Sequence, residues 1–232
     1  MGEPLQIGLL IFPKITQLDM TGPYEAFARI PGVKVHLIWK RIEPITSDVG
    51  MPLLPTMTLR ECPPLDVICI PGGPGQVDLM DDEEIIAFVR RQGLQARYVT
   101  SVCTGALVLG AAGLLDGYNA TTHWASIDNL EHFGATPVNT RVCVDRNRIT
   151  GGGITAGLDF GLYLASVLAD RETAERIQLF LEYTPEPPFT SGSPATAPKA
   201  VVEKLSAAIA PMLTRRKEAT LRAAQRLKST TS

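Results

Sequence analysis

Four short runs rich in apolar residues lie in the first half of the chain, and they constrain its fold more than any other feature. The runs cover residues 5–12, 33–39, 66–70 and 97–102. Apolar runs of this length are typical of strands that are buried on both faces of a parallel sheet. Segments with helical periodicity alternate with them, as in residues 81–95 and 106–112. This alternation, with short connections, predicts a doubly wound α/β fold.

The segment after the first run contains Thr21 and Pro23, and it predicts a helix that starts at Thr21. A hydroxyl residue is a frequent helix cap, and proline is favoured in the first turn. Asp19 is then expected in the loop before this helix, at the carboxyl edge of the sheet. The carboxyl ends of parallel strands converge on one crevice, so Asp19 is a candidate acid or base. The alternative is that it caps the helix.

The composition changes near residue 184. Five prolines fall within residues 184–198, and a helical pattern with many basic side chains fills residues 199–228. We interpret residues 1–183 as an α/β domain. Residues 184–232 are interpreted as a proline-rich strap and a basic helical segment that packs on the core or on a partner subunit, with a break or kink at Pro211.

Charge and cysteine usage exclude several classes of protein. A net charge of −2 argues against an extensive basic surface that would bind nucleic acid. The four cysteines lie far apart and lack the spacing of a metal site, so we expect free thiols, no metal and a reducing, cytoplasmic location. No apolar stretch reaches the roughly 18 residues of a membrane span, so no membrane contact is expected.

Cys103 carries the clearest chemical signal in the sequence. It stands where the run at residues 97–102 ends and a helix of small residues begins. Such a turn lifts a side chain above the edge of the sheet, as in a nucleophile elbow. The first amides and the dipole of the helix favour a thiolate at this point. We therefore predict a nucleophile at Cys103, against the simpler interpretation of an inert buried thiol.

Two glycine-rich segments are expected at the same edge of the sheet. Gly72 and Gly73 follow the third run, and Gly152, Gly153 and Ile154 precede a predicted helix at residues 154–168. Glycine lets backbone N–H groups approach a ligand closely, so these five are candidate substrate or anion-hole residues. Tight turns without a ligand would explain the same glycines.

The remaining cysteines and the histidines give weaker signals. We interpret Cys62, Cys69 and Cys143 as structural, because none stands at the start of a predicted helix. A cysteine–histidine pair needs an imidazole beside the sulfur, and His123 is the candidate for that position. A histidine bonded to the backbone is the favoured interpretation.

The motifs around these residues resemble those of the ThiJ/PfpI superfamily. The resemblance is carried by residues 18–23, 67–73, 100–106, 114–117, 120–124, 151–157 and 181–183. It implies a flavodoxin-like three-layer sandwich, a homodimer, and no metal or organic cofactor. By position it makes Cys103 the nucleophile, Asp19 the acid or base, and Thr104 a neighbour that activity requires. PfpI-type proteases carry histidine where this chain has Thr104, so peptidase activity is not expected.

Within the superfamily the resemblance is strongest to the branch that hydrates isonitriles. It implies that Cys103 forms a thioimidate with the terminal carbon of a small-molecule isonitrile, while Asp19 supplies a proton. We predict that the two groups titrate as a coupled pair. Two alternatives remain open: another enzyme for small electrophiles such as glyoxals, and a ligand-sensing or redox-sensing domain that binds a partner or DNA through the basic segment.

Overall fold

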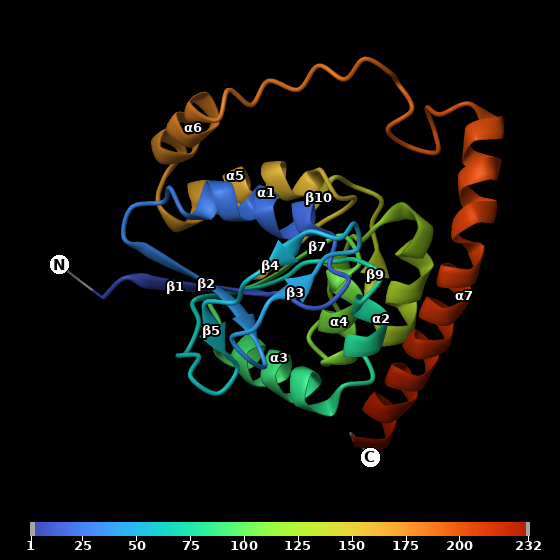
Figure 1. Cartoon of the computed structure of the whole chain (residues 1–232), viewed down its shortest axis with the longest axis horizontal. Coiled ribbons are helices and arrows are strands. Elements are labelled where there is room, and N and C mark those ends of the chain that lie inside the picture. Colours follow the sequence, from blue (N-terminus) through green and yellow to red (C-terminus); the bar gives the residue numbers. More distant parts are fainter. Residues whose placement is uncertain (1–2, 231–232) are drawn as a thin grey trace.

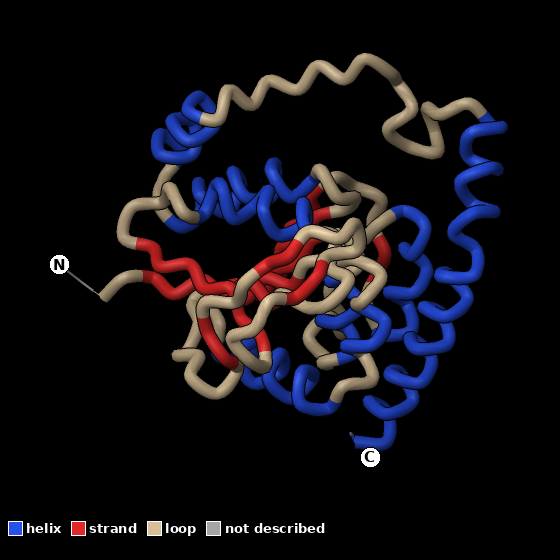
Figure 2. The backbone as a smooth tube through the Cα atoms, in the orientation of Figure 1, coloured by secondary structure: helices blue, strands red, loops and turns tan. Residues whose placement is uncertain are grey.

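The computed structural model describes residues 3–230 and confirms an α/β sandwich with a mainly parallel sheet (Figures 1 and 2). Within these residues the main sheet has seven strands in the order β10-β11-β7-β6-β1-β2-β5. The strands β10 and β11 are antiparallel to each other, and the other neighbours are parallel. Their bounds are β1 (Leu5–Leu10), β2 (Val33–Trp39), β5 (Met57–Thr58), β6 (Val67–Ile70), β7 (Tyr98–Val102), β10 (Val142–Asp145) and β11 (Arg148–Gly151).

Short pairs of strands and the helices complete the sandwich. The pairs are β3 (Ile45–Thr46) with β4 (Pro52–Leu53), and β8 (Asn119–Ala120) with β9 (Thr136–Pro137). The helices are α1 (Gln17–Phe27), α2 (Gln76–Leu79), α3 (Glu83–Gln95), α4 (Gly105–Ala111), the 3₁₀ segment η1 (Trp124–Phe133), α5 (Ala156–Leu168), α6 (Arg171–Phe180) and α7 (Lys199–Thr230). Helices α1, α5 and α6 lie on one side of the sheet, and α2, α3, α4 and α7 lie on the other (Figure 1).

The predicted start of the first helix at Thr21 is wrong. The helix α1 begins at Gln17, and both Thr21 and Pro23 lie inside it. The Thr21 hydroxyl caps nothing, because it donates to Gln17 Oε1 within the same helix at 2.9 Å. Pro23 is accommodated because it packs on α5 at Gly157, where an added Cβ would lie 3.0 Å from Pro23 Cδ.

The turn from β7 into α4 depends on a glycine. A Cβ on Gly105 would overlap the backbone carbonyl oxygen of Ile70 and would lie 2.8 Å from that of Pro71. The end of β6 therefore lies directly against the first turn of α4. Since the clash involves backbone on both sides, no side chain can rotate to relieve it.

Gly105→Ala is expected to destabilise the protein by about 3 kcal/mol or more, the upper range for overpacking. Gly192→Ala is the matched control, because nothing lies within 4 Å of a Cβ at that exposed position. Urea unfolding measures both changes. A Gly105→Ala midpoint equal to that of the control would show that the close approach to β6 is not needed.

The C-terminal part of the chain follows the main body as an open loop and a long helix. Residues 184–198 are mostly exposed and arch away from the body (Figures 1 and 2). Helix α7 then packs against α2, α4 and η1. It runs past Pro211 as one helix, so the predicted break there is wrong. The division of the chain at residue 184 and a contact with a partner subunit stay predictions.

Candidate active site

Cys103 occupies the sharp turn that was predicted between a strand and a helix. Its φ of 54° lies in the left-handed region, which residues with a side chain adopt at a cost. The surroundings hold this geometry: the Cys103 N–H donates to Gly151 O at 3.0 Å, and the Cys103 carbonyl accepts from Thr122 Oγ1 at 2.7 Å. The residue is 5% exposed. Strain that is held by neighbouring strands in this way is typical of a functional position.

Asp19 reaches this turn from the first turn of α1, not from a loop as predicted. Its side chain is fully buried, and its Oδ2 accepts from the Gly72 N–H at 2.9 Å. Within residues 3–230, Oδ1 has no hydrogen-bond partner. Burial raises the pKa of this carboxyl to about 7, although the bonds from Gly72 and the Cys103 thiol act in the opposite direction. The carboxyl is therefore protonated over part of the neutral range.

The thiol and the carboxyl shift each other. Burial and the charge of Asp19 raise the pKa of the Cys103 thiol well above its usual range, whereas the Thr104 amide and Arg216 lower it. Two acids that share one buried site do not ionise together, because a second negative charge would have no solvent around it. These mutual shifts favour a coupled titration of Asp19 and Cys103, which stays a prediction.

Thr104 and the first glycine segment form the other wall. The Gly73 N–H donates to Thr104 Oγ1 at 3.1 Å, as the Gly72 N–H does to Asp19. A Cβ on Gly72 would lie 2.6 Å from the Thr104 amide nitrogen and 2.7 Å from Asp19 Oδ2. In this structure the two glycine amides hold an acid and a hydroxyl in place. Their role toward a substrate or an anion stays a prediction.

The second glycine segment begins where β11 ends beside the elbow. The pairing of Gly151 with Val102 across β11 and β7 brings Gly152, Gly153 and Ile154 to the same edge. The Gly152 N–H donates to Arg141 O at 2.9 Å, while within residues 3–230 the N–H groups of Gly153 and Ile154 donate to no protein group. These last two amides are the ones that keep a hydrogen available, and their role as substrate or anion-hole residues also stays a prediction.

His123 is not arranged as a base for Cys103. It caps η1, and its Nδ1 accepts from the Ala125 N–H at 3.3 Å. The favoured interpretation of a histidine bonded to the backbone is confirmed. The other cysteines lie in β6, in β10 and in a loop, and burial raises the pKa of Cys69 to about 12 and that of Cys62 to about 11.

Three buried polar side chains that sequence reasoning did not single out lie near the elbow. They are Gln76 at the start of α2, Ser126 in η1 and Arg216 in α7, and Arg216 bonds to both of the others at 3.0 Å. The signal that could have found Arg216 is its place on the apolar stripe of α7. It falls four residues after Met212 and three before Ala219, which is fully buried.

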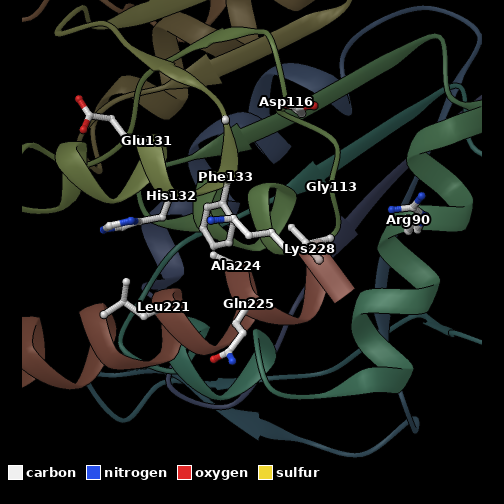
Figure 3. Close-up of a pocket in the computed structure, with 12 residues that line it drawn as sticks. Arg90, Gly113, Asp116, Glu131, His132, Phe133, Leu221, Ala224, Gln225 and Lys228 are labelled. Atoms are coloured by element: carbon white, nitrogen blue, oxygen red, sulfur yellow. The ribbon is translucent and has the colours of Figure 1, made fainter. Parts of the chain in front are cut away.

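The larger cavities lie away from Cys103. A groove of about 600 Å³ runs between η1 and the C-terminal part of α7, and Figure 3 shows Arg90, His132, Phe133, Leu221 and Ala224 on its walls. A second cavity, of about 520 Å³, lies between α6 and the loop that follows α1, and a third, of about 400 Å³, lies between α3 and α7. Cys103, Asp19 and Thr104 line none of the three, and Cys103 is nearly closed off from solvent.

Within residues 3–230, no group of three or more histidine, cysteine or acidic side chains is arranged to hold a metal ion. No helix in this part of the chain combines the length and apolar character needed to cross a bilayer.

The sequence pattern of the DJ-1/PfpI family matches residues 6–166, which include the elbow, Asp19 and both glycine segments. The chain belongs to the DJ-1/PfpI family. It is 58% identical over 223 residues to isonitrile hydratase of Pseudomonas putida. The aligned region covers 96% of this chain and 98% of that protein. The structure is also similar to the crystal structure of a ThiJ/PfpI family protein from Pseudomonas syringae, with a TM-score of 0.92 and 44% sequence identity. The superposition covers 95% of this chain and 91% of that one.

Another similar protein is matched over only part of its length. The HTH-type transcriptional regulator GbdR of Pseudomonas aeruginosa is 28% identical over 190 residues, and the match spans 51% of its length and 78% of this chain. This DJ-1/PfpI chain matches about half of that regulator, whereas it matches the hydratase almost end to end.

Proposed function

We propose that this chain is an enzyme that hydrates isonitriles to N-substituted formamides, with Cys103 as the nucleophile. One observation carries the proposal. A buried pair of Cys103 and Asp19 lies at a strained elbow in a chain that is 58% identical, over 96% of its length, to an isonitrile hydratase. A nucleophile beside a group that can hold or release a proton is what covalent addition requires.

Above about pH 7 the Cys103 thiol and the Asp19 carboxyl hold one proton between them, and the first step uses that proton. The Cys103 Sγ adds to the terminal carbon of R–N≡C while Asp19 takes the thiol proton and delivers it to the same carbon. One S–C bond and one C–H bond form, and the product is a neutral thioimidate, R–N=CH–S–Cys103. The Thr104 amide and the positive end of α4 stabilise the sulfur while it is anionic.

The second step releases the enzyme. Water adds to the thioimidate carbon and loses one proton, and the nitrogen gains one, with Asp19 as the relay. The tetrahedral adduct then collapses: the C–S bond breaks, the C=O bond forms, and the leaving sulfur takes back the remaining hydroxyl proton. The products are R–NH–CHO and the free thiol, so the atoms of one water molecule are consumed in each turnover.

The closed site suits this class of substrate. Cys103 is 5% exposed and Thr104 3%, so a bulky reacting group would not reach the sulfur. An isonitrile presents a bare carbon at the end of a linear N≡C group, which needs little space beside the nucleophile. Burial of the pair also strengthens the electrostatic interactions between the reacting atoms.

The activity is expected to depend on Asp19 through pH. Protonation of Asp19 removes the acceptor for the thiol proton, so kcat/KM for cyclohexyl isonitrile should fall about tenfold for each pH unit below about 7. Formamide production from pH 5 to pH 9 measures the profile. A rate that is flat from pH 5 to pH 8 would contradict this assignment of the proton.

The same assay separates the two kinds of enzyme that the sequence leaves open. Cyclohexyl isonitrile and methylglyoxal are supplied in parallel reactions at pH 8, with formamide and lactate as the measured products. The proposal expects formamide and no lactate. Lactate without formamide would move the function to glyoxal chemistry, and neither product would favour a sensor domain.

A further inference from the structure

Arg216 is a buried cation without an acidic partner. It is 3% exposed, and its Nε, Nη1 and Nη2 groups donate to Gln76 Oε1 at 3.0 Å, Ser126 Oγ at 3.0 Å and Met212 Sδ at 3.5 Å. None of the ion pairs among residues 3–230 includes Arg216. A buried charge with neutral partners alone destabilises a fold by several kcal/mol. Stability therefore does not explain why an arginine is buried at position 216, and a functional role would.

The two side chains that hold Arg216 belong to the loops that build the site. Gln76 starts α2 directly after the glycine segment whose amides hold Asp19 and Thr104. Ser126 lies four residues after Thr122, whose hydroxyl donates to the Cys103 carbonyl. The guanidinium thus links both loops from outside. Within residues 3–230, the buried Nε2 of Gln76 has no hydrogen-bond partner, so this polar cluster is not saturated.

The anionic group that acts electrostatically on Arg216 is the Cys103 thiolate. Arg216 lowers the pKa of Cys103, and Cys103 raises that of Arg216 against the effect of burial. Asp19 ionises above about pH 7, but its Oδ2 accepts from the Gly72 N–H, and its charge is not among the causes that shift the pKa of Arg216. The remaining titratable groups around Arg216 supply no buried anion. Burial and Arg216 lower the pKa of His123, which disfavours a positive charge on its ring. Asp78 on α2 is exposed and forms an ion pair with Arg215. The remaining charged or titratable side chains on the neighbouring helices are exposed to solvent: Asp128, Glu131 and His132 on η1, and Lys217 and Glu218 on α7.

We propose that Arg216 is a positioning residue for the nucleophile. Its guanidinium fixes the loop before Gln76 against the loop before Ser126, and its charge offsets the negative charge that develops on Cys103 when the thiol loses its proton. Helix α7 thereby completes the site, although it lies more than 90 residues beyond the elbow in the sequence. This role of Arg216 rests on the proposed function, but its test measures the reactivity of the Cys103 thiol and does not require turnover of an isonitrile.

The experiment follows alkylation of Cys103 by iodoacetamide as a function of pH, with peptide mass spectrometry to separate Cys103 from the other cysteines. Arg216→Gln and Arg216→Met both remove the charge, and Arg216→Met restores apolar packing should the glutamine variant fail to fold. We expect an apparent pKa about one unit higher in either variant and alkylation at pH 7 about tenfold slower. Arg216→Lys keeps the charge and should keep the wild-type pKa.

Arg215→Gln is the matched control, because the neighbouring arginine is exposed and pairs with Asp78 on the surface. It should leave the profile unchanged. The proposal is overturned if the folded charge-free variants titrate as the wild type does, or if Arg216→Lys is shifted as far as Arg216→Gln. A shifted profile in a protein that forms no formamide from isonitriles would support this inference and reject the hydratase.

Discussion

Replacing Cys103 by alanine is expected to abolish formamide formation from isonitriles, with kcat reduced by about 10⁴-fold or more. No other thiol can take its place. Cys62, Cys69 and Cys143 lie in a loop, in β6 and in β10, away from the start of any helix, and burial raises the pKa of each. The substitution changes little else, since alanine meets the same cost at a φ of 54°.

Two measurements check this expectation. The first is formamide production by Cys103→Ala beside Cys143→Ala, a matched control in which a buried thiol is removed from a strand and turnover should persist. The second is the mass of the acid-quenched wild-type protein, which should increase by the mass of one isonitrile during turnover. Residual turnover in Cys103→Ala, with no mass increase in the wild type, would mean that the reaction does not pass through a thioimidate on this residue.

The elbow and the sheet could be predicted because their signals are local. Strand β2 has the predicted bounds, and β6 and β7 each differ by one residue from the predicted runs. Apolar side chains fill most positions of these strands, so the sequence marks them without reference to the rest of the fold. Cys103 follows such a strand directly and precedes residues small enough for α4 to start.

The start of α1 could not be predicted in the same way. Thr21 and Pro23 have the local pattern of a first helical turn, but Pro23 is accommodated in the helix interior by the glycines of α5. Those glycines lie more than 130 residues away in the sequence. The consequence reaches the site, because a helix that begins at Gln17 places Asp19 in its first turn and fixes the direction of the carboxyl.

The directions of the glycine amides and the burial of Arg216 are also tertiary properties. Glycine at positions 72 and 73 predicts a backbone that can approach a ligand closely, but not that its N–H groups point at Asp19 and Thr104. In the same way, the basic residues of the C-terminal segment predict a helix that packs on the core or on a partner, but not which of them is buried. The helix places one of them, Arg216, against α2 and η1.

Asp19→Asn is expected to change activity and stability in opposite directions. Asparagine cannot accept the thiol proton, so kcat should fall by about 10²- to 10⁴-fold, the range for a lost acid–base group. Its Oδ1 can still accept the bond from Gly72. The folded protein gains stability because a buried carboxyl with a pKa of about 7, against an ordinary 3.8, disfavours the folded state wherever the unfolded chain is ionised.

The sign and the pH range follow from those two values. Below about pH 4 the carboxyl is protonated in both states and contributes no penalty; the penalty grows up to about pH 7 and is then constant at about 4 kcal/mol. Urea unfolding should therefore show Asp19→Asn more stable than the wild type at pH 8, with the difference shrinking at pH 5. Asp128→Asn, on the exposed face of η1, should show neither effect.

These two effects of Asp19→Asn share one cause, so they test each other. A variant that loses turnover without gaining stability at pH 8 would mean that the Asp19 carboxyl is solvated in the working enzyme. A variant that gains stability and keeps its turnover would mean that the carboxyl is buried as described but is not the proton carrier. The expected pair of results, lower activity with higher stability, would show that the fold retains an unfavourable buried acid beside Cys103 because the chemistry there requires it.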